Sequence, residues 1–202
     1  IGVVRQFNYD SRNNTAYLID GEGNTSTQQF DGINRLIKTI RDIRENGKGN
    51  GSIIDTIETE NIWNKNSLLV GIKDDKGNLT TNIFDPLDRL KKEIMPDGTS
   101  KEFSYDLSGY VVQIIDPNGN IINQNFDQLN RLTRKNIIRA NNVSGTTFEE
   151  FSYDGKSRMI YAKNDCSLVS MNYNSLDMMI EESLQIGNLP IKTTKSVYDN
   201  VG

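Results

Sequence analysis

The sequence predicts an all-β protein built from tandem β-hairpins, and three recurring features predict it. An aromatic residue followed by Asp or Asn recurs along the 202 residues, and four of its eight intervals equal 21 residues. A glycine turn falls at a fixed distance after the aromatic in every 21-residue interval. The runs between these signals are short and rich in β-branched residues, which is typical of strands. Regular self-similarity of this kind indicates a repeat architecture.

The first signal is the aromatic–acid pair, whose successive spacings are 21, 33, 21, 21, 21, 27, 20 and 25 residues. The pairs are Tyr9-Asp10, Phe30-Asp31, Trp63-Asn64, Phe84-Asp85, Tyr105-Asp106, Phe126-Asp127, Tyr153-Asp154, Tyr173-Asn174 and Tyr198-Asp199. An arginine follows five residues after the aromatic in four copies, as Arg35, Arg89, Arg131 and Arg158. We expect each recurrent acid to cap the turn after its aromatic or to pair with the arginine in the same phase.

The second signal is a glycine fourteen residues after the aromatic, present as Gly23, Gly77, Gly98 and Gly119. Glycine tolerates the positive φ of a hairpin tip, so each unit is predicted to be one hairpin. Pro86 in DPLD (85–88) suits the second position of a type I turn after the aromatic. The longer intervals place their extra residues at the glycine turn, in 44–52 and 140–147, where insertions are tolerated. The last repeats are degenerate, because Ser167 replaces the turn glycine and Met178 replaces the arginine.

Composition indicates an ordered chain with little core. Hydrophobic residues make up 35% and the mean hydropathy is -0.58, which is little material for a thick apolar core. The aromatic and β-branched residues nevertheless indicate order. About eight units of two strands, polar enough for water on both faces, predict a single-layer sheet. A sheet that wide must twist, coil or close, so we expect residues 1–202 to form one curved array.

Several function classes are excluded or disfavoured. The formal charge of -4 without a basic block predicts no nucleic-acid partner, and no apolar run is long enough for membrane insertion. The absence of histidine removes histidine-based catalysis and histidine metal sites. Cys166 is the single cysteine and cannot form an internal disulfide. We expect no enzyme activity, no catalytic or metal residues and no cofactor.

Two binding alternatives compete with a structural role. DGEGN (20–24) and DDKGN (74–78) gather oxygen ligands around a glycine, but neither fits the calcium-loop pattern. Glycan- and choline-binding repeats are also aromatic-rich hairpins of about this length, which leaves a cell-surface carbohydrate or cell-wall module open as an alternative. Those repeats are rich in tryptophan, whereas this chain has only Trp63. The recurrent aromatics are therefore expected to pack against the neighbouring unit.

Units such as FDPLDRLKKEIMPDGTSKEFSYD (84–106) and YDLSGYVVQIIDPNGNIINQNFD (105–127) resemble the YD repeats of the Rhs family. That family includes bacterial Rhs and wall-associated polymorphic toxins, the B and C components of insecticidal Tc toxins, and the animal teneurins. The resemblance covers nearly the whole chain. It implies a spiralling β-sheet ribbon that forms part of a hollow shell.

In the toxins of this family the shell encloses a C-terminal toxic polypeptide, so the resemblance implies a non-catalytic, encapsulating role. The implied partners are the remainder of the shell and the enclosed polypeptide, and the implied location is secreted or at the cell surface. DPNGN (116–120) resembles part of the family's self-cleavage motif, but the phase of Asp116 identifies an ordinary turn. Both ends fall inside units, so we expect an internal fragment of a larger protein.

Overall fold

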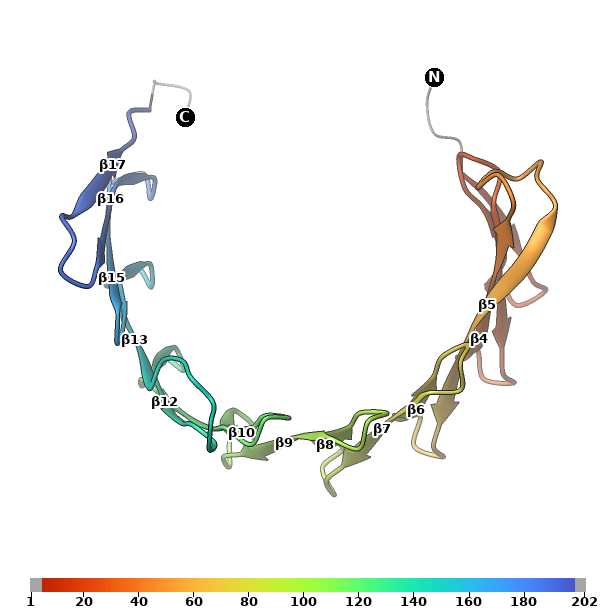
Figure 1. The fold of residues 1–202 in the computed structure, drawn as a ribbon, viewed down its shortest axis with the longest axis horizontal. Helices are drawn as coiled ribbons and strands as arrows, with labels where there is room; N and C mark the ends of the chain where they lie inside the picture. Colours follow the sequence, from red (N-terminus) through yellow and green to blue (C-terminus); the bar gives the residue numbers. More distant parts are fainter. Residues whose placement is uncertain (1–4, 199–202) are drawn as a thin grey trace. The chain divides into compact units, whose positions relative to one another are not determined.

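The computed structural model describes residues 5–198, and every regular element in that range is a β-strand (Figure 1). The strands are β1 (Gln6–Tyr9), β2 (Thr15–Ile19), β3 (Thr25–Phe30), β4 (Leu36–Arg44), β5 (Ile53–Trp63), β6 (Leu69–Lys73), β7 (Leu79–Phe84), β8 (Leu90–Ile94), β9 (Ser100–Tyr105), β10 (Val111–Ile115), β11 (Ile121–Phe126), β12 (Leu132–Ile138), β13 (Phe148–Tyr153), β14 (Met159–Asn164), β15 (Ser167–Tyr173), β16 (Met179–Ile186) and β17 (Lys192–Lys195). Among residues 5–198 there is no helix of the length and apolar character needed to span a membrane. The predicted all-β class is confirmed.

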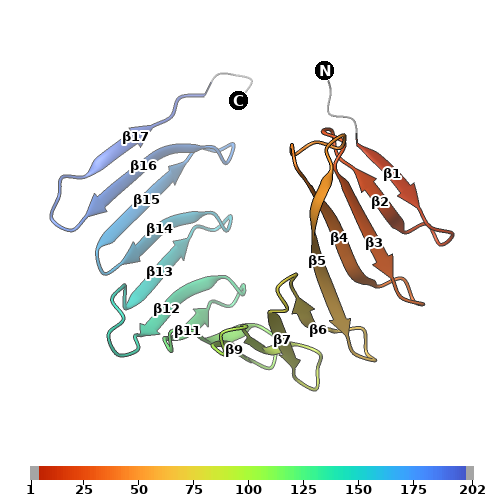
Figure 2. The same cartoon turned by 45° about the vertical axis from the view of Figure 1, so that its right-hand side comes forward.

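The chain divides into two compact units, Ile1–Ser100 and Lys101–Gly202. In the first unit, β1 to β8 form a meander in which each strand pairs antiparallel with the next. In the second unit, β9 to β17 do the same. Figure 2 shows the strands of each unit side by side in one layer. Within each unit, tandem hairpins therefore build a single-layer sheet.

Most strand connections are five-residue turns that share one backbone pattern. The N–H of the first turn residue donates to the carbonyl of the fifth, and the N–H of the fourth donates to the carbonyl of the first. The aromatic turns, defined as those that follow an aromatic–acid pair, span 10–14, 31–35, 64–68, 85–89, 106–110, 127–131, 154–158 and 174–178. The glycine turns of this geometry span 20–24, 74–78, 95–99 and 116–120. Both ends of a regular hairpin are thus made by the same type of turn.

The fourth residue of each turn has positive φ. In the glycine turns it is the recurrent glycine, with φ between 83° and 84°. In the aromatic turns it is Asn13, Asn34, Ser67, Asp88, Gly109, Asn130, Ser157 or Asp177. Sequence reasoning recognised only the glycine turns as positions of positive φ. Asn and Asp tolerate this conformation better than other residues with a side chain, which is the signal that identifies the second set.

A β-bulge accompanies the aromatic turns and places the recurrent aromatic residue. In the first unit the register shifts between Asn8 and Tyr9, between Gln29 and Phe30, between Ile62 and Trp63, and between Ile83 and Phe84. A type I turn followed by a residue of positive φ produces a bulge of this kind. The aromatic ring therefore sits at the point where pairing ends and the turn begins.

The single layer leaves the described residues without a conventional core. No hydrophobic side chain of residues 5–198 is buried, and the one buried polar side chain, Asn120, is 9% exposed. The solvent-accessible surface is 13752 Å², whereas a globular protein of 22.8 kDa has roughly 9,600 Å². Order is therefore maintained by backbone ladders and half-buried side chains, which explains the low hydrophobic content.

The 33-residue interval between Phe30 and Trp63 differs in part from the prediction that its extra residues lie at the turn. The 33-residue interval lengthens the strands as well as the turn, because β4 has 9 residues and β5 has 11. The loop between them returns over the neighbouring glycine turn, where Gly49 N–H donates to the carbonyl of Glu22 at 2.8 Å. A Cβ on Gly49 would collide with the backbone of Gly23, so the loop requires a glycine there.

The prediction that Ser167 takes the place of the turn glycine is wrong. Ser167 is the first residue of β15 and not part of the tip. The connection between β14 and β15 consists of Asp165 and Cys166, and neither has positive φ. No residue of this connection is left-handed, so it requires no glycine, and its shortness accounts for the 20-residue interval. Cys166 is exposed at this tip.

Replacement of Gly98 by alanine is expected to lower the free energy of unfolding by about 1 kcal/mol, because a side chain at its φ of 84° is strained. Gly155→Ala is the matched control. An added Cβ meets nothing within 4 Å at either glycine, but Gly155 lacks positive φ. The control should change stability by less than about 0.5 kcal/mol in urea denaturation. Equal effects of the two substitutions would contradict a conformational origin.

Candidate functional site: the aromatic turns and their arginine links

The aromatic turns carry the recurrent acids at their first position. In the turn at 127–131, Asp127 Oδ1 accepts the backbone N–H groups of Leu129 and Arg131 at 2.9 and 3.0 Å. Its Oδ2 accepts Arg131 Nε at 2.7 Å. The carboxylate therefore caps the turn with one oxygen and holds the arginine with the other. Asp31, Asp85 and Asp154 make the same contacts with Arg35, Arg89 and Arg158.

Where the fifth turn residue is asparagine, the same carboxylate geometry recurs with an amide partner. Asp10 and Asp20 accept the side-chain amides of Asn14 and Asn24 at 2.9 and 3.2 Å. Asp74 and Asp116 accept those of Asn78 and Asn120 at 2.8 and 2.7 Å. These oxygens, proposed as possible calcium ligands in two turns, serve the turn itself. Within residues 5–198 there is no group of three or more His, Cys, Asp or Glu side chains placed to hold a metal ion.

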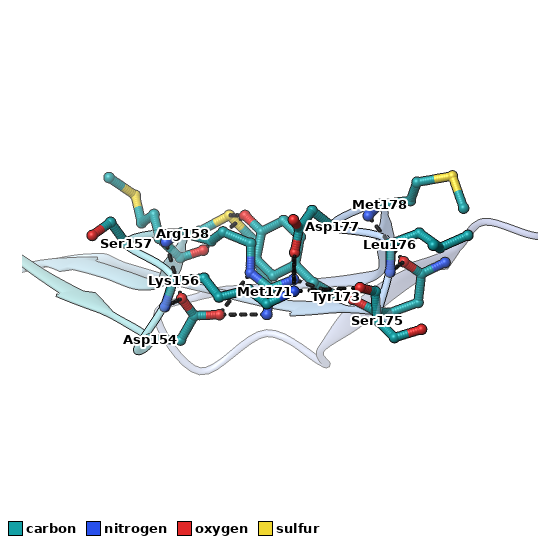
Figure 3. A network of polar contacts seen from close by, with 12 residues as sticks. Asp154, Lys156, Ser157, Arg158, Met171, Tyr173, Ser175, Leu176, Asp177 and Met178 are labelled. Carbon is teal, nitrogen blue, oxygen red and sulfur yellow. Dashed lines mark hydrogen bonds and ion pairs between the residues drawn. The ribbon is translucent and has the colours of Figure 1, made fainter.

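Three of the arginines, Arg35, Arg131 and Arg158, also reach the next aromatic turn along the sheet, and we call this set of contacts an arginine link. Arg158 bonds Asp154 through Nε at 2.7 Å and donates through Nη1 to the carbonyl of Asn174 at 3.1 Å (Figure 3). The same nitrogen bonds Asp177 Oδ1 at 2.6 Å. Its guanidinium lies 4.7 Å from the centre of the Tyr173 ring, within the range of a cation–π interaction. Arg158 therefore joins two neighbouring aromatic turns.

Two further links repeat this arrangement. Arg35 donates to the carbonyl of Asn64 at 2.9 Å and lies 5.6 Å from the centre of the Trp63 ring. Arg131 donates to the carbonyl of Asp154 at 3.2 Å and lies 4.8 Å from the centre of the Tyr153 ring. Contacts that recur in phase between neighbours are the nearest-neighbour interactions that stabilise repeat arrays.

The aromatic residues complete the links with their polar atoms. Tyr153 Oη donates to the carbonyl of Leu132 at 2.9 Å, and Trp63 Nε1 donates to that of Leu36 at 2.8 Å. Tyr173 and Tyr198 bond the equivalent carbonyls of Met159 and Met179 at 2.8 Å. The rings of Trp63, Tyr153 and Tyr173 thus pack against the arginine and backbone of the preceding unit. At Tyr198, Met178 takes the place of that arginine. Asp199, the acid of the last pair, lies outside the described residues.

The remaining recurrent positions are placed as follows. Tyr9 is 61% exposed, whereas Phe30, Phe84, Tyr105 and Phe126 are half-buried at the ends of β3, β7, β9 and β11. Asp106 Oδ1 accepts the N–H of Tyr110 at 2.9 Å. Gly23, Gly77, Gly98 and Gly119 lie at the opposite ends of the hairpins. The aromatic positions and the glycines are therefore separated by the length of a strand.

The electrostatics of the turn acids suit a structural role. The side chains of Arg89 and Arg131 hold the pKa of Asp85 and of Asp127 below the usual 3.8. The pKa of Asp31 is lowered chiefly by the N–H of Arg35. Burial alone would raise the pKa of Asp116, but hydrogen bonds from Asn120, Asn118 and Gly119 together outweigh it and the pKa is lowered. Acids held ionised in this way are poor proton donors at neutral pH.

We expect acid to unfold the chain while stability stays nearly constant between pH 5 and 8. A carboxylate whose folded pKa is depressed stabilises the fold above its unfolded pKa, and this contribution is lost as the pH falls through the folded pKa. The turn acids share a reference value of 3.8, so the loss begins near that pH. The chain has no histidine to titrate between pH 5 and 8. Urea denaturation from pH 8 to 2 measures this, and a loss of stability above pH 5 would contradict it.

Comparisons with known proteins identify the fold. No protein-family model matches the chain, and neither does any curated protein. The crystal structure of TcdB2–TccC3 is similar, with a TM-score of 0.71 and 14% identity, over 89% of this chain and 11% of that one. That of TcdB2–TccC3–TEV has a TM-score of 0.65 and 12% identity, over 89% and 13%.

A third structure is the Tc holotoxin pore of Photorhabdus luminescens with a mutated TccC3, at a TM-score of 0.55 and 13% identity. The similarity covers 12% of that chain and 89% of this one. This chain thus spans about one eighth of the length of the proteins it matches. At these identities the likeness establishes a shared fold, that of a β-sheet found in Tc toxin complexes.

Proposed function

We propose that this chain is a non-catalytic wall segment of an Rhs-type toxin shell, which encloses a toxic polypeptide for delivery to target cells. The observation that carries the proposal is the single-layer sheet without a buried hydrophobic side chain in residues 5–198. A wall that separates an interior from the solvent must present hydrated surfaces on both faces, and this sheet does. The similarity to chains of Tc toxin complexes over 89% of this chain supports the same role.

The chemistry of the described residues supports a wall rather than a catalyst. Asp116, which lies in the stretch that resembles a cleavage motif, accepts the N–H groups of Asn118 and Asn120, both at 2.9 Å. Cys166 is exposed, and the chain has no histidine that could activate it. The recurrent arginines that could grip an acidic cargo instead bond the carboxylates of their own turns.

The proposal assigns two partners and a location. The partners are further repeats of the same shell and the polypeptide that the shell encloses. The location is outside the producing cell or at its surface. These assignments rest on the resemblance of the repeats and on the Tc holotoxin to which the fold is similar.

Limited proteolysis of the natural gene product that contains this chain tests enclosure. We expect the part of that product that lies outside the repeats to resist trypsin in native buffer and to be digested once denaturant opens the sheet. The same polypeptide expressed without the repeats is the control and should be digested at once. Equal digestion with and without the repeats would contradict the proposal.

A glycan panel tests the carbohydrate alternative. The structure does not favour it, because Trp63 donates its Nε1–H to the carbonyl of Leu36 and its ring lies against the Arg35 guanidinium. We expect no saturable retention of the chain on bacterial cell wall or on the panel. Retention that Trp63→Phe abolishes would assign the chain to carbohydrate binding instead.

A further inference from the structure

Strand β5 has an edge that no neighbouring strand covers along more than half of its length. On one side, β4 pairs with β5 from Ile53 to Glu60. On the other side, β6 pairs only from Glu60 to Trp63. Residues 53–59, which we call the free edge, therefore have a strand on one side only, and β5 extends well past β6 in Figure 2.

The backbone of the free edge offers hydrogen bonds to an incoming strand. Thr56 N–H donates to the side chain of Asp55 at 2.8 Å, which indicates that it points away from β4. Peptide groups alternate in direction along a regular strand, so that of Glu58 points the same way. The register of the pair with β4 shifts between Asp55 and Ile53, so the alternation does not extend to Ile54. Thr56 and Glu58 are not involved in a strand pair on that side within the part of the chain that the structure describes. Unpaired edges of this kind are templates for strand addition.

The side chains around the free edge combine apolar and acidic character. Ile53, Ile54 and Ile57 are 53%, 63% and 39% exposed. Beside them lies a hollow of about 430 Å³, where β6 ends and its turn begins. The hollow is lined by Thr56, Glu58, Glu60, Lys73, Asp74, Asp75, Lys76 and Gly77. A strand added to the free edge would lie end to end with β6 and would pass through this hollow.

Acids outnumber lysines at this surface. With Asp55 of the edge there are five acids, against the two lysines of the hollow and Lys38, which pairs with Glu58 at 2.6 Å. Lys73 lies 3.7 Å from Glu60. Two copies of the free edge paired with one another would oppose their own carboxylates, which destabilises cross-strand pairs. The surface thus favours a cationic strand over a second copy of this chain.

We propose that the free edge of β5, residues 53–59, binds an extended, positively charged polypeptide segment as an added β-strand. Backbone groups of Thr56 and Glu58 provide the ladder, as in other cases of β-strand addition. The exposed isoleucines contact alternate aliphatic side chains of the segment, and Asp55 and Asp75 attract its cations. The proposal concerns this edge alone and holds whether or not the chain belongs to a shell.

Fluorescence anisotropy with synthetic octapeptides tests the proposal on the 202-residue chain. The probe is a labelled peptide of alternating valine and lysine, which should bind saturably. The same peptide with N-methyl groups on every second residue lacks one hydrogen-bonding edge and should bind at least about tenfold more weakly. A valine–glutamate peptide should not bind. Absence of saturable binding, or equal binding of the N-methylated peptide, would overturn the proposal.

Variants of the edge connect the binding to these residues. Thr56→Pro removes the outward N–H but leaves the ladder with β4 intact, so the fold should persist in circular dichroism while binding falls at least about tenfold. If this variant does not fold, Asp55→Lys/Asp75→Lys serves instead. This double variant should bind the valine–lysine peptide more weakly and should bind the valine–glutamate peptide. Unchanged binding in the folded variants would refute the assignment. So would a dimer in sedimentation that Thr56→Pro abolishes, since the occupant would then be a second copy.

Discussion

Tyr153→Ala is expected to lower the free energy of unfolding by about 3 kcal/mol. The substitution removes a ring that lies 4.8 Å from the Arg131 guanidinium and a hydroxyl that donates to the carbonyl of Leu132 at 2.9 Å. Tyr153→Phe retains the ring and loses only the hydrogen bond, so its cost should be about 1 kcal/mol. Urea denaturation, with local hydrogen exchange in β12 and β13, measures both.

Tyr9→Ala is the matched control for this prediction. Tyr9 occupies the same repeat position but is 61% exposed, so its loss should change stability by less than about 0.5 kcal/mol. A similarly small effect of Tyr153→Ala would mean that the recurrent ring is not part of the packing between units. It would then be free to contact a ligand, as the carbohydrate alternative requires.

Arg131→Ala is expected to lower the free energy of unfolding by about 1.5 kcal/mol, because it breaks an arginine link. The guanidinium bonds Asp127 Oδ2 at 2.7 Å, donates to the carbonyl of Asp154 at 3.2 Å and covers Tyr153. Combined with Tyr153→Ala, the loss should fall short of the sum of the two single effects by about 1 kcal/mol, since each substitution removes the shared contact.

Arg139→Ala is the control for the arginine. Its guanidinium donates to the carbonyl of Gly145 inside its own loop at 2.9 Å, so its removal should leave the pairing of units unchanged. The effect should stay below about 0.5 kcal/mol. Additive effects of Arg131→Ala and Tyr153→Ala would contradict the link, because residues that do not interact show additive changes.

The period of the sequence predicted where the hairpins begin and end, and the structure confirms the all-β class. Tyr153 and Asp154 fall at the end of β13 and the start of its turn because a fixed spacing in sequence becomes a fixed position in a meander. The interval between Phe30 and Trp63 was harder to interpret. Its extra residues were predicted to lie at the turn, but they extend β4 and β5 as well, since strands that continue to pair gain more hydrogen bonds than a longer loop alone would.

Contacts between units could not be derived from the sequence. Arg158 was expected to pair with a nearby turn acid, but its reach to Asn174 and Tyr173 depends on the stagger of neighbouring hairpins. The left-handed residue of the aromatic turns had a signal that was overlooked, because Asn13, Asn34 and Asn130 recur four residues after the aromatic. A search for Asn at that phase would have found it.

The sequence by itself determined the strand class, the two turns of each unit and the low content of buried hydrophobic surface. These properties are local, because a left-handed turn position, a short β-branched run and an apolar fraction are read within one unit. Only the tertiary structure decided which atoms join one unit to the next and which edge is left without a partner. The arginine links and the free edge of β5 depend on the register between strands, and register is set by pairing across units rather than by any single one.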